Sequence, residues 1–253
     1  MNPVLVATLT ALSVMANLSE GYLYQWHTGE ENLYALKTLL ADGMLSGGVK
    51  LSLPVEEQDL AYHAESIPVC LKEPFGSACF LEAHNQIRKA LMEGTFYQYP
   101  KVANMHKLEW SSELARRAEA RLANCAAFDR VPQEGETFVE LDPTRPDAIA
   151  VVNAWMIQSS HRSRVFKNVQ EAVLTEKIRS NMHRATQVAW ADNYEVGCAH
   201  KCGFVLCKYG PCRGGNQLNK VIFKTGEPGS KCEHGKTEPD TKFCLKPSIP
   251  PTC

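Results

Sequence analysis

The sequence predicts an α+β fold in which helices precede a small antiparallel sheet. Three segments with helical patterns, at about 79–94, 111–125 and 147–161, come before two short β-segments around Gly203. The second observation is an even set of ten cysteines, which is typical of a disulfide-stabilised protein. With 253 residues, 44% of them hydrophobic, the chain is long enough for one sizeable core with some chain left over.

The first two helices are predicted from apolar spacing and from their ends. Phe80, His84, Ile87 and Leu91 form one stripe, which stops at Gly94. Such a histidine is usually a satisfied core residue.

In the second helix Ser111 is a suitable N-cap, and the apolar positions are Leu114, Ala118, Leu122 and Cys125. This spacing places Cys125 on the buried face, where its thiol could link the helix to the sheet. The third helix is expected from about Asp147 to His161.

The sheet is predicted around a hairpin. Val188, Trp190 and Val196 lead to Gly197-Cys198, and the apolar run 204–206 follows Gly203. We interpret these as two β-segments joined by a turn that a disulfide stabilises.

The cysteines indicate disulfides in preference to a metal ribbon, because none of them form the Cys-x-x-Cys spacing that zinc ribbons use. Five bridges are possible, and the sequence leaves their pairing open. The disulfide candidates are Cys70, Cys79, Cys125, Cys198, Cys202, Cys207, Cys212, Cys232, Cys244 and Cys253.

Both ends of the chain differ in character from its centre. Residues 1–16 contain the apolar stretch of a secretory signal peptide, although no Lys or Arg precedes it, and export agrees with the cysteine count. Residues 17–70 are predicted to be an N-terminal extension or linker. Residues 227–253 are rich in Gly, Pro, Lys and Cys, and they indicate a disulfide-tethered C-terminal extension without a core of its own.

Two motifs in the right order carry a family resemblance. Thr-Gln-Val-Ala-Trp at 186–190 leads to Gly-Cys-Ala at 197–199, and Cys-Lys-Tyr-Gly-Pro at 207–211 leads to Gly-Asn at 215–216. The string resembles the signature region of the CAP superfamily of cysteine-rich secretory, antigen 5 and pathogenesis-related proteins. The matching residues are Gln187, Trp190, Gly197, Cys198, Cys207, Tyr209, Pro211 and Asn216.

The resemblance implies a three-layer αβα sandwich, with residues 71–226 as the CAP (SCP) domain. The wording His84-Asn85-x-x-Arg88, followed by Lys-Ala-Leu-Met-Glu-Gly, is most similar to activation-associated secreted proteins of nematodes. That likeness implies an extracellular, host-directed or immunomodulatory binding protein. The step from fold to role is an analogy.

The resemblance also supplies candidate site residues. Many CAP proteins have a cleft with two histidines and two glutamates that could bind zinc. The corresponding residues here are His84, Glu136, Gln158 and Arg184, and an amide is a poor zinc ligand. His183 is one residue out of register, which is a rotation of about 100° on a helix. We therefore expect Arg184 to enter the cleft and pair with Glu136, which gives a degenerate cleft without catalytic residues, metal or cofactor.

Several functions are disfavoured, and others stay open. The net charge of −1 gives no reason to expect nucleic acid or an anionic membrane as the partner. The apolar stretch 4–16 is too short to span a bilayer as a helix, so stable membrane insertion is not expected. No Gly-x-Ser-x-Gly elbow is present, and paired cysteines cannot act as nucleophiles. A secreted, non-enzymatic protein that binds an unknown protein or lipid is the favoured interpretation. The alternatives are a lipid or sterol carrier and a zinc-dependent hydrolase that uses His84 and Glu136.

Overall fold

The computed structural model describes residues 68–141, 147–157, 160–233 and 237–248. Gln158, Cys253, the predicted signal peptide and nearly all of the N-terminal extension lie outside the described residues. The elements in chain order are α4 Pro68–Lys72, α5 Ser77–Glu93, β1 Glu109–Trp110, α6 Ser112–Arg121, η2 Cys125–Ala127, β2 Glu136–Glu140, α7 Ala148–Ile157, η3 Ser160–Phe166, β3 Glu171–Val173, α8 Glu176–Val188, β4 Glu195–Lys201, β5 Phe204–Gly210 and β6 Val221–Lys224.

The central sheet has four strands in the order β1-β4-β5-β2. The pairs β4-β5 and β5-β2 are antiparallel, as predicted, but β1 runs parallel to β4, so the sheet is mixed. Cys202 and Gly203, with φ of 60° and 74°, form the two-residue turn between β4 and β5. Positive φ at both turn residues matches the right-handed twist of the paired strands.

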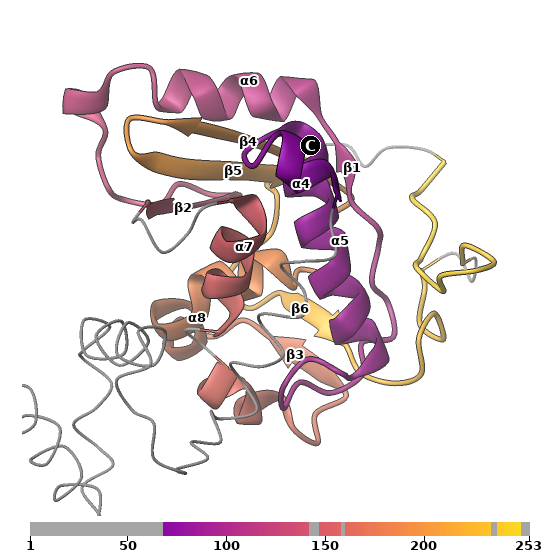
Figure 1. Ribbon diagram of the computed structural model, residues 1–253. Coiled ribbons are helices and arrows are strands. Elements are labelled where there is room, and N and C mark those ends of the chain that lie inside the picture. Colours follow the sequence, from indigo (N-terminus) through magenta and orange to yellow (C-terminus); the bar gives the residue numbers. More distant parts are fainter. Residues whose placement is uncertain (1–67, 142–146, 158–159, 234–236, 249–253) are drawn as a thin grey trace, which may run out of the picture. The chain divides into compact units, whose positions relative to one another are not determined.

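Helices cover both faces of the sheet, which confirms the αβα arrangement. Helix α6 lies across β4 and β5, and α5, α7 and α8 lie on the other side (Figure 1). Every residue of β5 is buried, and alternate side chains enter two different cores. Phe204 and Leu206 pack with α6, whereas Val205, Cys207 and Tyr209 belong to the larger core with α5 and α7.

The predicted helix ends follow from local chemistry. Gly94 ends α5 in the left-handed conformation, with φ of 70°. Ser111 caps α6, and its Oγ accepts a hydrogen bond from the Leu114 amide at 3.3 Å. Asp147 Oδ1 accepts one from the Ala150 amide at 2.8 Å where α7 begins. The described part of α7 runs to Ile157.

Helix α8 was missed by the sequence analysis. Val188 is its last residue, and Trp190 lies in the following loop, so the first hairpin strand begins at Glu195 and not at Val188. Thr175 caps the helix, and its apolar residues Ile178, Met182 and Ala185 recur at intervals of three or four. A strand was predicted here because β-branched and aromatic residues, such as Val188 and Trp190 near the end of α8, are common in strands.

Between described residues, four disulfides join eight cysteines, and Cys212 is also disulfide-bonded. The prediction of a disulfide-rich chain is therefore confirmed. Cys125 pairs with Cys202 and links the end of the α6 region to the hairpin turn, as expected. The prediction that Cys125 lies on the buried face of the helix is wrong, because Cys125 lies beyond α6, in the exposed turn η2.

The described C-terminal extension is held by packing and hydrogen bonds. Its disulfide, Cys232–Cys244, is internal to the extension. Phe243 enters the main core at 3% exposure, and the Cys244 amide donates to the Met105 carbonyl at 2.8 Å. The Lys231 amide donates to the Ala103 carbonyl at 3.1 Å. Among the described residues, no helix is both long and apolar enough to cross a membrane.

Candidate functional site

The structure places His84 and Glu136 on opposite faces of the sheet. Glu136 on β2 is opposite Lys208 on β5, and both point toward the α6 side. His84 on α5 contacts Tyr209, the next residue of β5, which faces the other way. His84 and Glu136 are therefore not brought together, because neighbouring strand residues point to opposite faces.

His84 is completely buried and has both ring nitrogens engaged. Nδ1 lies 2.7 Å from the Phe80 carbonyl oxygen, and Nε2 lies 2.8 Å from the Tyr209 hydroxyl. The carbonyl can only accept, so Nδ1 carries the proton and Nε2 accepts from Tyr209. Burial lowers the pKa of His84 to about 4. The histidine is thus a neutral, satisfied core residue.

The carboxylate of Glu136 is buried and paired on both oxygens. Lys208 Nζ lies 2.6 Å from Oε2, and Arg121 Nε lies 3.5 Å from Oε1. The Gln133 amide donates to Oε1 at 2.9 Å. Lys208 and Arg121, and not Arg184, therefore provide the positive charges beside Glu136. Lys208 lies opposite Glu136 in the register of β2 and β5, and this register was not predicted from the sequence.

Arg184 and His183 differ from the predicted arrangement. Arg184 Nε donates to the Phe138 carbonyl at 3.1 Å. His183, which was expected to point away, lines a depression of about 700 Å³ together with Glu136. Met182 has non-helical angles, φ −139° and ψ 17°, and this kink interrupts the helical register on which the prediction depended. Burial, together with the charge of Arg184, lowers the pKa of His183 to about 4.

The depression that Glu136 and His183 line carries side-chain charges of both signs. Its cations Arg179 and Arg213 pair with Glu176 at 2.7 Å and with Glu134 at 3.6 Å. The remaining lining residues are Pro132, Gln133, Ser180, Asn216, Gln217, Leu218 and Lys220.

The signature residues of the second motif connect the loop after β5 to α8. Asn216 accepts a hydrogen bond from Thr186 Oγ1 at 2.7 Å and donates one to the His183 carbonyl at 2.6 Å. Gln187 Nε2 donates to the Gly214 carbonyl. Pro211 follows a cis peptide bond. These contacts fix the loop on the helix, which is a structural role.

The signature residues of the first motif serve close packing. A Cβ atom on Gly197 would lie 2.2 Å from the Ala115 amide nitrogen, so only glycine lets α6 approach β4. Cys198 and Cys207 are opposite each other on β4 and β5 and form a disulfide. Trp190 is 5% exposed and packs in the main core.

Arg88 is a buried residue whose role the sequence analysis did not identify. Its guanidinium makes contacts of 2.7–3.1 Å with carbonyl oxygens of His106, Val188, Trp190, Ala191 and Asn193. Burial lowers its pKa to about 9. These partners are main-chain atoms 18 to 105 residues away, so side-chain patterns in the sequence do not reveal them.

Comparisons with known proteins agree with this fold. The family model for the cysteine-rich secretory protein family, CAP, matches residues 81–209. This match covers half of the chain, and the protein therefore belongs to the CAP family. Two relatives are a scoloptoxin, SSD976, from Scolopendra dehaani and the Ancylostoma secreted protein from Ancylostoma caninum. The scoloptoxin is 29% identical over a match that covers 65% of this chain and 81% of the scoloptoxin. The Ancylostoma protein is 28% identical over a match that covers 62% of this chain and 41% of the Ancylostoma protein.

Solved structures show the same fold. BmVAL-1 superposes with a TM-score of 0.55 at 23% identity, over 68% of this chain and 94% of its own. NaASP2, in a structure with Zn²⁺, gives a TM-score of 0.52 at 22% identity, and the match covers 68% of this chain and 98% of NaASP2. At these identities the likeness concerns the fold.

Proposed function

We propose that this protein is secreted and acts as a non-enzymatic binding protein with a host-directed, immunomodulatory role. Its disulfides suit an oxidising extracellular compartment. The relatives include a scoloptoxin and the Ancylostoma secreted protein, and these names support export and action outside the producing cell.

The buried, ion-paired carboxylate of Glu136 is the observation that supports a non-enzymatic function. A general base or a zinc ligand needs a free carboxylate lone pair near the substrate. The carboxylate of Glu136 has 0% side-chain exposure and is held by Lys208 and Arg121. Chemistry at this position would first have to break a buried ion pair, and leaving one such charge unpaired costs about 3–5 kcal/mol.

The test combines binding with turnover. Labelled protein, secreted from eukaryotic cells, is applied to human leukocytes, and saturable binding and cytokine release are measured with and without a zinc chelator. The same protein is incubated with Zn²⁺ and ester or peptide substrates. We expect saturable binding that the chelator does not change, and hydrolysis no greater than that of Glu136→Gln. Absence of saturable binding, or zinc-dependent hydrolysis lost in Glu136→Gln, would contradict the proposal.

A further inference from the structure

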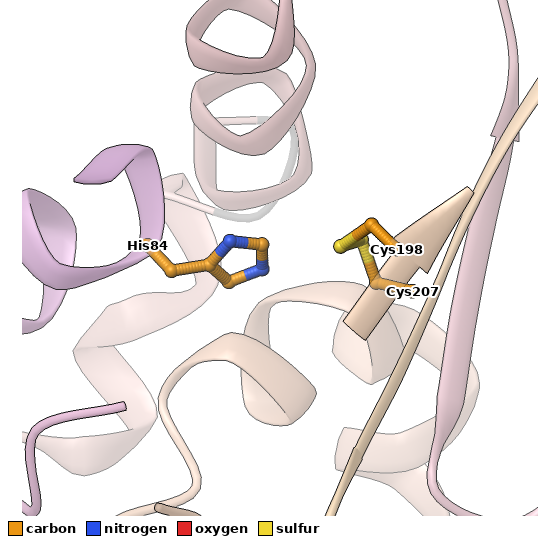
Figure 2. Close-up of side chains that lie close together, drawn as sticks. All are labelled: His84, Cys198 and Cys207. Atoms are coloured by element: carbon orange, nitrogen blue, oxygen red, sulfur yellow. A yellow bond between two sulfur atoms is a disulfide. The ribbon is translucent and has the colours of Figure 1, made fainter. Parts of the chain in front are cut away.

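One group of soft ligands lies in the main core, away from the depression. His84, Cys198 and Cys207 each offer a ligand atom, and these atoms lie within 4.8 Å of one another. Figure 2 shows the imidazole on α5 directed toward the disulfide that joins the two strands. In the oxidised protein the two sulfur atoms are bonded to each other, so this group holds no metal.

We propose that reduction of the Cys198–Cys207 disulfide converts this group into a binding site for a thiophilic metal ion such as Zn²⁺. Two thiolates and one imidazole are a ligand set that zinc prefers, with Zn–S of about 2.3 Å and Zn–N of about 2.0 Å. The complex of Zn²⁺ with two thiolates and a neutral imidazole has no net charge. A buried site accepts such a complex far more readily than it accepts an ion.

The imidazole is already oriented for this role. Nδ1 donates to the Phe80 carbonyl at 2.7 Å, which leaves the lone pair on Nε2. In the oxidised protein that lone pair accepts a hydrogen bond from the Tyr209 hydroxyl at 2.8 Å. Tyr209 and Cys207 are two residues apart on β5 and share one face of the sheet. Binding of Zn²⁺ at Nε2 would therefore break the hydrogen bond from the Tyr209 hydroxyl.

Two buried donors near the group lack acceptors. Thr137 is opposite Cys207 in the β2-β5 register, so their side chains share one face. Among the described residues its Oγ1 has no hydrogen-bond partner, and neither has Nε1 of Trp155. The Trp155 ring lies edge-on to His84, with 6.2 Å between centroids. Thiolate sulfurs would offer acceptors to such donors, whereas a disulfide offers weaker ones.

The redox step requires an external reductant, such as a dithiol. One thiolate of the dithiol attacks Cys198, which is 7% exposed, and forms a mixed disulfide while Cys207 leaves as a thiolate. The second thiol of the dithiol then closes its own disulfide and releases Cys198. Two electrons pass to the protein, and binding of Zn²⁺ displaces the two thiol protons.

The experiment compares metal binding before and after reduction. The full chain is reduced with a phosphine, which is removed before Zn²⁺ is added, and stoichiometry is read by native mass spectrometry. Co²⁺ replaces Zn²⁺ for absorption spectra. We expect the reduced protein to bind one more Zn²⁺ than a Cys198→Ala/Cys207→Ala variant treated identically, with tetrahedral thiolate bands for Co²⁺. The unreduced protein should bind no ion at this group.

Two further measurements separate a folded site from loose thiols. His84→Gln should weaken zinc binding at least tenfold, a loss that an unfolded chain with other histidines would not show. In the wild-type chain, Zn²⁺ should slow alkylation of Cys198 and Cys207 relative to the other cysteines, as peptide mapping reads out. Equal zinc stoichiometry in wild type and the double variant, or alkylation that zinc leaves unchanged, would overturn the proposal.

Discussion

Single residues in this protein stabilise the fold through main-chain contacts that few substitutes could make. Arg88 is the clearest example, because one guanidinium satisfies five carbonyl oxygens between the loop at His106 and the end of α8. Its contacts are charge-assisted and completely buried, a setting in which hydrogen bonds are strong and unmade bonds are costly.

We expect Arg88→Met to lower the free energy of unfolding by about 3–5 kcal/mol, because the buried carbonyl oxygens would lose the charged donor that they share. Urea denaturation measures the change. Arg116→Met is the matched control, since Arg116 pairs with Glu113 on the exposed surface of α6. A loss at Arg88 no larger than the control would contradict this account.

The buried imidazole of His84 makes stability depend on pH. Its pKa is lowered to about 4 in the folded protein, from an ordinary value of 6.5. As the pH falls below 6.5, the unfolded chain takes up the proton first, so stability is lost down to about pH 4. The loss is about 1.4 kcal/mol per pH unit, or about 3 kcal/mol in total.

The corresponding experiment is chemical denaturation at several pH values between 7 and 4. His84→Gln should flatten the slope of stability against pH by about 1.4 kcal/mol per unit near pH 5. Equal slopes in the two proteins would mean that His84 does not contribute to acid destabilisation.

At the scale of elements, the sequence predicted those whose chemistry is local. The stripe of α5, the N-cap at Ser111 and the turn at Gly203 depend on neighbouring residues, and all three are present. Helix α8 was missed because Val188 and Trp190 favour strands by composition, although Thr175 provides a cap. The position of His183 was missed because a kink at Met182 cannot be read from helical spacing.

The C-terminal extension behaves as an element of the core. Phe243→Ala should lower the free energy of unfolding by about 3–4 kcal/mol, because it removes a buried ring and leaves a cavity. Leu245→Ala is the control, since Leu245 is 43% exposed. Hydrogen exchange of residues 227–248 should accelerate in the first variant alone. Unchanged protection in Phe243→Ala would show that the extension is held by other contacts.

For the whole molecule, the disulfides close loops of very different lengths. Cys125–Cys202 spans 77 residues, whereas Cys232–Cys244 spans 12. Loop entropy in the unfolded chain therefore makes the first bridge worth about 4.5 kcal/mol and the second about 3 kcal/mol. Replacing each pair with alanine and comparing thermal unfolding tests this order. The reverse order would show that loop entropy is not the main contribution.

The candidate site shows where prediction from sequence reaches its limit at this scale. The family motifs identified the fold, but carrying single residues over placed His84 and Glu136 in one cleft, and the sheet separates them. Which face of a strand a residue occupies depends on register, and a shift of one residue reverses it. Lys208 and Arg121 therefore form the ion pairs with Glu136 that were expected for Arg184.

The contacts of Arg88 also determine the order in which this protein can be completed during synthesis. Its carbonyl partners extend to Asn193, which is 105 residues later in the chain. At about 5–20 residues per second, the ribosome adds that residue roughly 5–20 seconds after Arg88. Throughout this interval the nascent helix carries an arginine on its apolar face, and the guanidinium stays hydrated. The core around α5 therefore closes only after Asn193 has been synthesised.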